Sequence, residues 1–330
     1  MTRDDVLKML EAHPDEYVSG AELAEALGIS RTAVWKAVEQ LRQDGYEIDS
    51  QPRRGHRLGS GSDVLSEAGI RRYLTDPRIS LRFYPTISST NTVLKGLAAE
   101  DAPAGLTLVA GEQTAGRGRL GRHFFSPSST GLYMSLLLRP EMEARDAVRL
   151  TACAAVAVAE AIESLSDEAP LIKWVNDIYI RDRKVCGILT EAGLNCETGR
   201  MDYVIVGIGI NTRIPDGDFP EEIRGVAGSV FAGRSAPDAR NRLAAGVLNR
   251  LIAYSDSPGA KDILKKYRER SFVVGKEIRI LAPGKEPVSA LALGIEEDYS
   301  LRVRMPDQRE ELISSGEISI RTKGGFPIAP

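Results

Sequence analysis

The stretch GEQTAGRGRLGR, residues 111–122, ends in three arginines interleaved with three glycines. Glycine lets a backbone approach a ligand closely, and arginine presents a rigid fork of donors that suits phosphate and carboxylate oxygens. Such a loop can wrap a small anionic ligand, so we expect it to fold over a nucleotide-derived intermediate. The local sequence leaves a second interpretation open, which is a flexible basic loop on the surface.

The same letters match the dinucleotide fingerprint G-x-G-x-x-G from Gly116 to Gly121. That fingerprint requires a strand before it and a helix directly after it. Residues 106–110 are typical of a strand. Residues 124–131, however, contain a Ser-Pro pair and no helical periodicity, and residues 132–138 are typical of another strand. The stretch therefore favours a loop between two strands over a doubly wound dinucleotide-binding fold.

The sequence on both sides of this loop predicts a mixed α+β domain. Neighbouring strands outnumber regular alternations of strand and helix, which favours a mixed sheet over a parallel one. The expected strands are residues 81–84, 106–110, 132–138, 171–174, 178–180, 185–191 and 203–210. The expected helices are residues 64–74, 90–99, 146–165, 238–254 and 260–269.

Beyond about residue 271, short apolar runs separated by turn residues predict a small β-barrel of SH3-like size. Its expected strands are residues 277–281, 288–293, 301–304, 311–313 and 318–321. The polar sequence GSGSD at residues 59–63 is typical of a linker. The chain is therefore expected to contain an N-terminal domain over residues 1–60, a central domain over residues 64–270 and a C-terminal domain over residues 271–330.

The N-terminal domain is predicted to be a winged helix-turn-helix. Ser19 and Glu22 have the spacing of a capping box, and Gly28 provides the stop at the end of the same helix. A helix, a short turn with glycine and a second helix are the signature of this motif. The expected elements are an amphipathic first helix, helices at residues 21–27 and 31–44, and a β-hairpin, the wing, at residues 46–50 and 56–58.

Cationic and polar side chains gather on one side of the third helix and at the tip of the wing. A recognition helix places its N-terminal side chains at base edges in the major groove, and a wing can reach backbone phosphate. A helix-turn-helix that serves protein contact or dimerisation is the alternative. The candidate DNA-binding residues are Arg31, Thr32, Trp35, Lys36, Arg53 and Arg54.

The composition is that of an ordinary soluble globular protein, with 42% hydrophobic and 27% charged residues in a chain of 330. The net charge of −3 creates no global field for nucleic acid, so any DNA contact must use a local basic patch. Three cysteines without a C-x-x-C pair suit reduced thiols, and three scattered histidines argue against a zinc site. We expect a cytoplasmic protein with no signal peptide and no membrane-spanning segment.

Four further stretches carry chemically active side chains. Residues 88–91, SSTN, precede a helix, where hydroxyls bind a polar ligand or cap the helix. Residues 173–177, KWVND, place a cation, an aromatic ring, an amide and a carboxylate at a strand end, although a buried Lys–Asp pair is also possible. Lys184 begins a strand in which Gly187 follows three places later. Such a lysine can bind a ligand, or it can be a solvated lysine in a turn. Residues 207–211, GIGIN, bring glycines to a strand end, where backbone can meet a ligand.

Together and in this order, these stretches resemble the biotin protein ligases, in particular the bifunctional kind that is also a biotin operon repressor. The family pattern is a serine-threonine-asparagine triplet, a GRGRxGR loop, KWPND, a lysine followed by glycine-isoleucine-leucine, GIGIN and a late GEIS, here residues 316–319. The resemblance implies a class II synthetase-like ligase domain between a winged helix-turn-helix and an SH3-like barrel. Two residues depart from it: Val175 replaces the usual proline, which we expect to loosen that turn, and Trp35 replaces a polar residue, which affects operator choice.

The resemblance implies two half-reactions, in which biotin and ATP form biotinyl-5′-adenylate and the biotin then passes to a lysine of a carboxylase carrier domain. The implied catalytic residues are Lys184, Arg119 and Arg117. The implied biotin-binding residues are Ser89, Thr90, Asn91, Gln113, Gly116, Arg117, Gly131, Tyr133, Lys184 and Gly187. The implied residues for ATP and the adenylate are Arg119, Arg122, Trp174, Asn176 and Asn211, and Asp177 is the candidate ligand of Mg²⁺.

The implied partners are the biotin carboxyl carrier domain of acetyl-CoA carboxylase or of another biotin-dependent carboxylase, operator DNA, and a second copy of the chain in a homodimer. Residues 212–228 are predicted to be mobile until the adenylate binds. A ligand-sensing repressor without catalysis is disfavoured by Lys184 and Asp177, and a lipoate or octanoate ligase by the Gly-Arg loop and the C-terminal barrel. A ligase whose N-terminal domain no longer binds DNA stays open.

Overall fold

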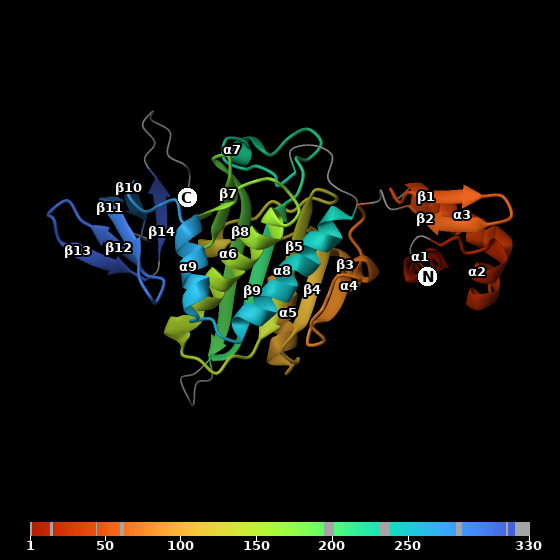
Figure 1. The fold of residues 1–330 in the computed structure, drawn as a ribbon, viewed down its shortest axis with the longest axis horizontal. Helices are drawn as coiled ribbons and strands as arrows, with labels where there is room; N and C mark the ends of the chain where they lie inside the picture. Colours follow the sequence, from red (N-terminus) through yellow and green to blue (C-terminus); the bar gives the residue numbers. More distant parts are fainter. Residues whose placement is uncertain are drawn as a thin grey trace. The chain divides into compact units, whose positions relative to one another are not determined.

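The computed structural model describes residues 2–13, 16–43, 45–59, 63–194, 201–231, 238–281, 286–314 and 316–320 (Figure 1). The chain forms two compact units. The N-terminal unit consists of residues 1–74 and 234–245, and the large unit consists of residues 75–233 and 246–330. The domain borders at residues 60, 64 and 271 stay predictions.

The N-terminal unit contains the predicted helix-turn-helix and hairpin. Ser19 accepts a hydrogen bond from the Glu22 amide while the Glu22 carboxylate accepts one from the Ser19 amide, so the capping box is present. Gly28, with a φ of 64°, ends that helix in the left-handed conformation. Apolar side chains of the three helices form the core, among them Leu10, Leu23, Val34, Val38 and Leu41. The elements are α1 (Thr2–Ala12), α2 (Gly20–Leu27), α3 (Arg31–Gln43), the antiparallel pair β1 (Ile48–Gln51) and β2 (Gly55–Leu58), and α4 (Glu67–Arg71). Helix α4 is shorter than the predicted helix at residues 64–74.

A seven-stranded mixed sheet forms the centre of the large unit, in the order β3-β4-β5-β9-β8-β7-β6 (Figure 1). Strands β3 and β4 are parallel, and all other neighbours in this sheet are antiparallel. The mixed sheet is therefore confirmed, as is the loop between two antiparallel strands. The strands are β3 (Ser80–Ile87), β4 (Leu106–Gln113), β5 (Gly131–Leu138), β6 (Leu171–Lys173), β7 (Asp177–Ile180), β8 (Arg183–Leu194) and β9 (Met201–Asn211).

Two of the helices make the most extensive contacts with the central sheet. Helix α5 (Thr90–Ala99) lies against β4, β5 and β9, and its bounds are those predicted. Helix α6 (Ala147–Glu163) contacts β6 to β9 and is buried on nearly all sides, because it consists largely of alanine and valine. The remaining helical segments are η1 (Arg119–Gly121), η2 (Ala144–Asp146), α7 (Glu221–Arg224), α8 (Ala239–Ser255) and α9 (Lys261–Arg270).

The C-terminal segment of the large unit forms a separate five-stranded antiparallel sheet in the order β13-β12-β11-β10-β14. The predicted run of short strands is thus observed, except that the last residue of the expected strand at 318–321 lies outside the described residues. The strands are β10 (Glu277–Leu281), β11 (Val288–Ile295), β12 (Leu301–Arg304), β13 (Glu310–Ile313) and β14 (Glu317–Ile320).

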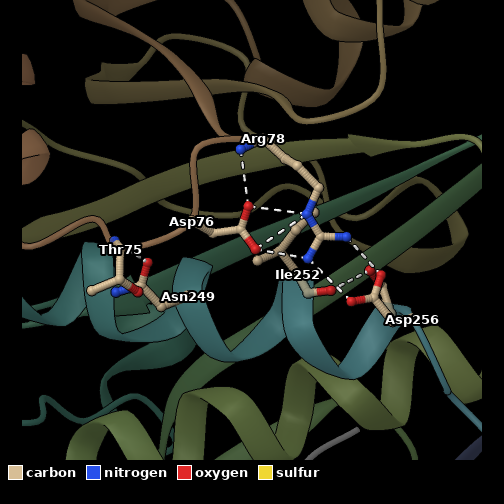
Figure 2. Close-up of polar contacts among 7 residues, drawn as sticks. Thr75, Asp76, Arg78, Asn249, Ile252 and Asp256 are labelled. Carbon is tan, nitrogen blue, oxygen red and sulfur yellow. Dashed lines mark hydrogen bonds and ion pairs between the residues drawn. The ribbon is translucent and has the colours of Figure 1, made fainter.

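Polar contacts fasten the segment before β3 to α8 within the large unit (Figure 2). The amide of Thr75 donates to Asn249 Oδ1 at 3.0 Å. The guanidinium of Arg78 lies between the carboxylates of Asp76 and Asp256, at 2.7 Å from each. Hydrogen bonds from Arg78 hold the pKa of the Asp76 carboxyl below its ordinary value. These contacts fix the first strand that leads to the site.

Candidate active site

A cavity of about 490 Å³ lies where the ends of β4, β8 and β9 meet the loops that follow or precede them. Its wall combines positive and polar side chains with the rings of the residues just after the Gly-Arg loop. The cavity brings together most residues that the sequence singled out. Those that line it are Ser89, Thr90, Asn91, Gln113, Arg117, Arg119, Arg122, Trp174, Asn176, Asp177, Lys184, Gly187 and Asn211.

Gly116, Gly131 and Tyr133 are not among the residues that line the cavity. A Cβ atom at Gly116 would lie 2.3 Å from the carbonyl oxygen of Phe124, and one at Gly131 would lie 2.1 Å from the hydroxyl of Tyr133. The Tyr133 side chain is buried and donates from its hydroxyl to the carbonyl of Pro127 at 3.0 Å. Only glycine fits at 116 and 131, because a side chain there would collide with Phe124 or Tyr133.

At one end of the cavity, the start of α5 and Gln113 form a connected polar group. Ser89 caps α5, and both the amide and the hydroxyl of Thr90 donate to Gln113 Oε1, at 2.9 and 3.1 Å. The side-chain amide of Gln113 in turn donates to Ser126 Oγ at 3.1 Å. These hydrogen bonds fix the positions of several polar groups at this end of the cavity.

Asn91 is held by three hydrogen bonds. Its Nδ2 donates to the carbonyl of Leu189 at 3.2 Å and to Glu191 Oε2 at 2.9 Å, and its Oδ1 accepts from Ser135 Oγ at 2.6 Å. A side-chain amide has only two N–H donors, so both are in use. The space for Asn91 exists because residue 207 is glycine, where a Cβ atom would lie 2.0 Å from Asn91 Oδ1.

The Gly-Arg loop forms a compact hairpin-like turn. Arg117 and His123 form an antiparallel bridge, and the amide of Gly118 donates to the carbonyl of Arg122 at 2.8 Å. At the tip, the guanidinium of Arg119 donates to Asn176 Oδ1 and to the carbonyl of Gly316, each at 3.0 Å. Arg119 therefore joins the loop both to the KWVND stretch and to the GEIS stretch.

Lys184 and Asp177 form an ion pair inside the cavity, with 2.7 Å between Nζ and Oδ1. The Asp177 side chain is largely buried, and its Oδ1 receives no well-aligned hydrogen bond from the residues that the structure describes. The adjacent Asn176 is anchored through its Nδ2, which donates to the carbonyl of Ile188 at 2.8 Å. Burial raises the pKa of the nearby Cys186 thiol well above its ordinary value, so this thiol stays protonated and is no nucleophile.

Trp174 has a structural anchor that the sequence did not reveal. Only 3% of it is exposed, and its indole N–H donates to the carbonyl of Tyr299 at 2.8 Å. The next peptide bond, between Trp174 and Val175, is cis. The hydroxyl of Tyr267 donates to the carbonyl of Val175 at 3.2 Å. The turn that carries Asn176 and Asp177 is therefore held by α9 and by the segment before β12.

Two further parts of the wall were not among the predicted site residues, although the second belongs to residues 212–228, which are predicted to be mobile until the adenylate binds. The ring of Phe124 lies over Gly209, where a Cβ atom would be 2.5 Å from the ring. The spacing of the glycines in GIGIN, which places them on one side of β9, was the available signal. The second part is the segment with Phe219, Ile223 and Val226, which lies beside Lys184: the Lys184 amide donates to the carbonyl of Val226 at 2.8 Å.

On the N-terminal unit, the candidate DNA-binding residues Arg31, Thr32, Trp35, Lys36, Arg53 and Arg54 are all exposed. Trp35 has 57% of its surface exposed, although it directly follows the core residue Val34. At the wing, the guanidinium of Arg54 stacks 4.3 Å above the ring centre of Tyr17. The structure therefore leaves a polar and cationic surface on the third helix and the wing.

The two sequence-family matches follow the two units. Residues 2–57 match the family described as HTH domain, and residues 83–211 match the biotin/lipoate A/B protein ligase family. The bifunctional ligase/repressor BirA of Bacillus spizizenii is 42% identical over 230 residues, which cover 69% of this chain and 70% of that protein. The chain belongs to the biotin protein ligase family.

Other members of this ligase family resemble the chain over a longer range or in three dimensions. BirA of Escherichia coli is 29% identical over 313 residues, which cover 93% of this chain and 94% of that protein. The solved structure of the biotin protein ligase from Aquifex aeolicus in complex with biotin and ATP is 30% identical, with a TM-score of 0.61, and covers 73% of this chain and 98% of that chain. Within the described residues, no helix is both long and apolar enough to cross a membrane.

Proposed function

We propose that this chain is an ATP-dependent biotin protein ligase that is also a biotin-responsive transcriptional repressor. The observation that carries the proposal is the single cavity, because side chains from all five family stretches between residues 88 and 211 line it together. Its polar end at Ser89, Thr90 and Gln113 suits the ureido head of biotin. Its cationic end suits a triphosphate.

In the first half-reaction, a carboxylate oxygen of biotin attacks the α-phosphorus of ATP. The bond from that phosphorus to the bridging oxygen breaks, and pyrophosphate leaves. One anion approaches another, so positive charge must offset their repulsion and stabilise the charge that grows on phosphorus. Lys184, Arg117 and Arg119 carry that charge around the cavity. Lys184 exchanges its partner Asp177 for the reacting oxygens when the substrates bind.

Mg²⁺ is the metal ion that we propose for this site. Asp177 and Glu222 both line the cavity and offer the hard oxygen ligands that Mg²⁺ prefers. The described residues contain no group of three or more His, Cys, Asp or Glu side chains that could hold a metal by themselves. That suits an ion that takes most of its ligands from phosphate and water. Asp177 would hold it, and it would neutralise phosphate charge.

In the second half-reaction, the amine of a carrier lysine attacks the carbonyl carbon of the mixed anhydride. The carbon–oxygen bond to phosphate breaks, AMP leaves, and the amine loses a proton. Until the carrier arrives, the adenylate must be kept from water. The Gly-Arg loop serves this purpose: its glycines let it open and its arginines hold the adenylate when it closes. Residues 212–228 close in the same way when the adenylate binds.

The N-terminal unit carries the repressor activity in this proposal. The adenylate favours a homodimer, and a dimer presents two recognition helices to a two-fold symmetric operator. A gel-shift titration with operator DNA should show tighter binding when biotin and ATP are both present. An affinity that is the same without them excludes this coupling. We place the protein in the cytoplasm, together with its carboxylase acceptor.

The enzyme proposal is tested by incubating the chain with biotin, Mg²⁺, ATP and a biotin carboxyl carrier domain. Mass spectrometry should show one added biotinyl group on the carrier lysine. A parallel incubation with lipoate in place of biotin should leave the carrier unchanged. An unmodified carrier in the biotin reaction, or equal labelling by lipoate, would overturn the assignment.

A further inference from the structure

Glu191 connects two of the stretches that line the cavity, although it is not part of the cavity wall itself. One of its oxygens, Oε2, accepts from Asn91 Nδ2 at 2.9 Å. The other, Oε1, accepts from Nη1 of Arg117 in the Gly-Arg loop at 3.3 Å. Both partners line the cavity. A single carboxylate on β8 thus joins the start of α5 to the loop.

The two contacts of Glu191 differ in rigidity. Asn91 is 4% exposed, and its amide is held on its other sides by the Leu189 carbonyl and the hydroxyl of Ser135. Arg117 has 46% of its side chain exposed, and it belongs to the loop that must open. The carboxylate is therefore fixed by Asn91, and Arg117 is the partner that it orients.

The charge of Glu191 has a direct effect on where the Arg117 guanidinium lies. A long arginine side chain at a half-exposed position samples many rotamers, and an oriented carboxylate restricts them. Because the same carboxylate is bonded to Asn91, the guanidinium is held close to the Ser89–Asn91 end of the cavity. An arginine held in advance loses less conformational entropy when an anionic ligand binds.

We propose that Glu191 is a positioning residue for the Gly-Arg loop: anchored by Asn91, it orients Arg117 for the closed loop over the adenylate. This inference rests on the proposed ligase function. Glu191 does not touch the substrate, and its effect on adenylate release acts through Arg117. Its second role, the acceptor for Asn91, needs an oxygen but no charge.

The test is a double-mutant cycle with Glu191→Gln and Arg117→Ala in the full-length chain. Glutamine keeps an acceptor oxygen for Asn91 and removes the charge that pairs with Arg117. Release of biotinyl-adenylate, followed after rapid dilution, should become about three- to fivefold faster in Glu191→Gln, as expected for a partly exposed ion pair. In the Arg117→Ala background the Glu191→Gln substitution should leave the rate of adenylate release unchanged. The difference in release rate between Glu191→Gln and the unmodified chain should also decrease as the salt concentration is raised, because salt screens an exposed ion pair.

The matched control is Glu168→Gln. Glu168 pairs with Arg181 at 2.7 Å and has 17% of its side chain exposed, against 20% for Glu191, and neither residue of that pair lines the cavity. Its release rate should equal that of the unmodified chain. Calorimetric titration of all variants with biotin and with synthetic adenylate separates a failure of the Glu191 proposal from a failure of the ligase proposal. If the unmodified chain binds neither, the ligase proposal fails and this one with it.

Two results would overturn the role of Glu191 while leaving the ligase proposal intact. The first is a release rate for Glu191→Gln equal to that of the unmodified chain. The second is an equal acceleration with and without Arg117, because it would show that Glu191 acts through another residue.

Discussion

Removal of the Arg119 guanidinium should free the tip of the Gly-Arg loop without unfolding the protein. The guanidinium donates to Asn176 Oδ1 and to the carbonyl of Gly316, each at 3.0 Å. A hydrogen bond from a charged donor contributes about 1.5–3 kcal/mol when buried, and Arg119 is only half-buried. We therefore assign the two bonds together about 2 kcal/mol, which corresponds to about a 30-fold faster release of adenylate from Arg119→Ala.

The assay is a chase of labelled biotinyl-adenylate that is synthesised beforehand and bound to each protein, with dissociation followed over time for Arg119→Ala, Arg119→Lys and the unmodified chain. Arg119→Lys keeps the charge but cannot reach both acceptors at once, so its rate should fall between the other two. Arg145→Ala is the control, because Arg145 is 80% exposed and lies outside the cavity wall. A rate for Arg119→Ala within twofold of the unmodified chain, with an unchanged melting temperature, would refute the reasoning.

Three further predictions concern single side chains. Lys184→Ala should abolish ATP–pyrophosphate exchange, since the positive charge beside Asp177 is lost; unchanged exchange refutes its role. Asp177→Asn should raise the Mg²⁺ concentration needed for half-maximal exchange by about tenfold or more, as expected for the loss of a carboxylate ligand; an unshifted Mg²⁺ titration excludes Asp177 as a ligand. Burial raises the pKa of Glu11, so the native state binds the carboxyl proton more tightly than the unfolded state does. The free energy of unfolding therefore decreases as the pH rises above about 4.3, the ordinary pKa of glutamate. Glu11→Gln should remove that decrease in hydrogen-exchange measurements on α1, and an unchanged pH dependence contradicts it.

Local signals were sufficient for most elements of the fold. The capping box at Ser19, the left-handed glycine at Gly28 and the bounds of α5 depend on residues close together in the chain, so the sequence predicts them. The same holds for the Gly-Arg loop, because the Ser-Pro pair after it excludes a helix. Where the bounds differ, as for α4, the structure shows the reason: Ser66 caps the helix by accepting from the Gly69 amide, so the helix begins at Glu67 and not at residue 64.

The contacts that organise the cavity are mostly between residues far apart in the chain, and periodicity carries no information on them. Trp174 meets the carbonyl of Tyr299, and Arg119 meets that of Gly316. Both acceptors are backbone carbonyls, so the residue types at positions 299 and 316 give no indication of these contacts. Glu191 looked like one more residue of a strand until the fold placed it beside Asn91 and Arg117. Side-chain identity predicted which residues gather, and the tertiary fold decided which of them touch the cavity.

The measurement that most directly tests the account is a crystal structure of the chain soaked with biotin and ATP. It should show biotinyl-adenylate in the cavity, with the Gly-Arg loop closed over it and with Arg119 and Lys184 in contact with its phosphate. A loop that points into solvent above an empty cavity would contradict the account.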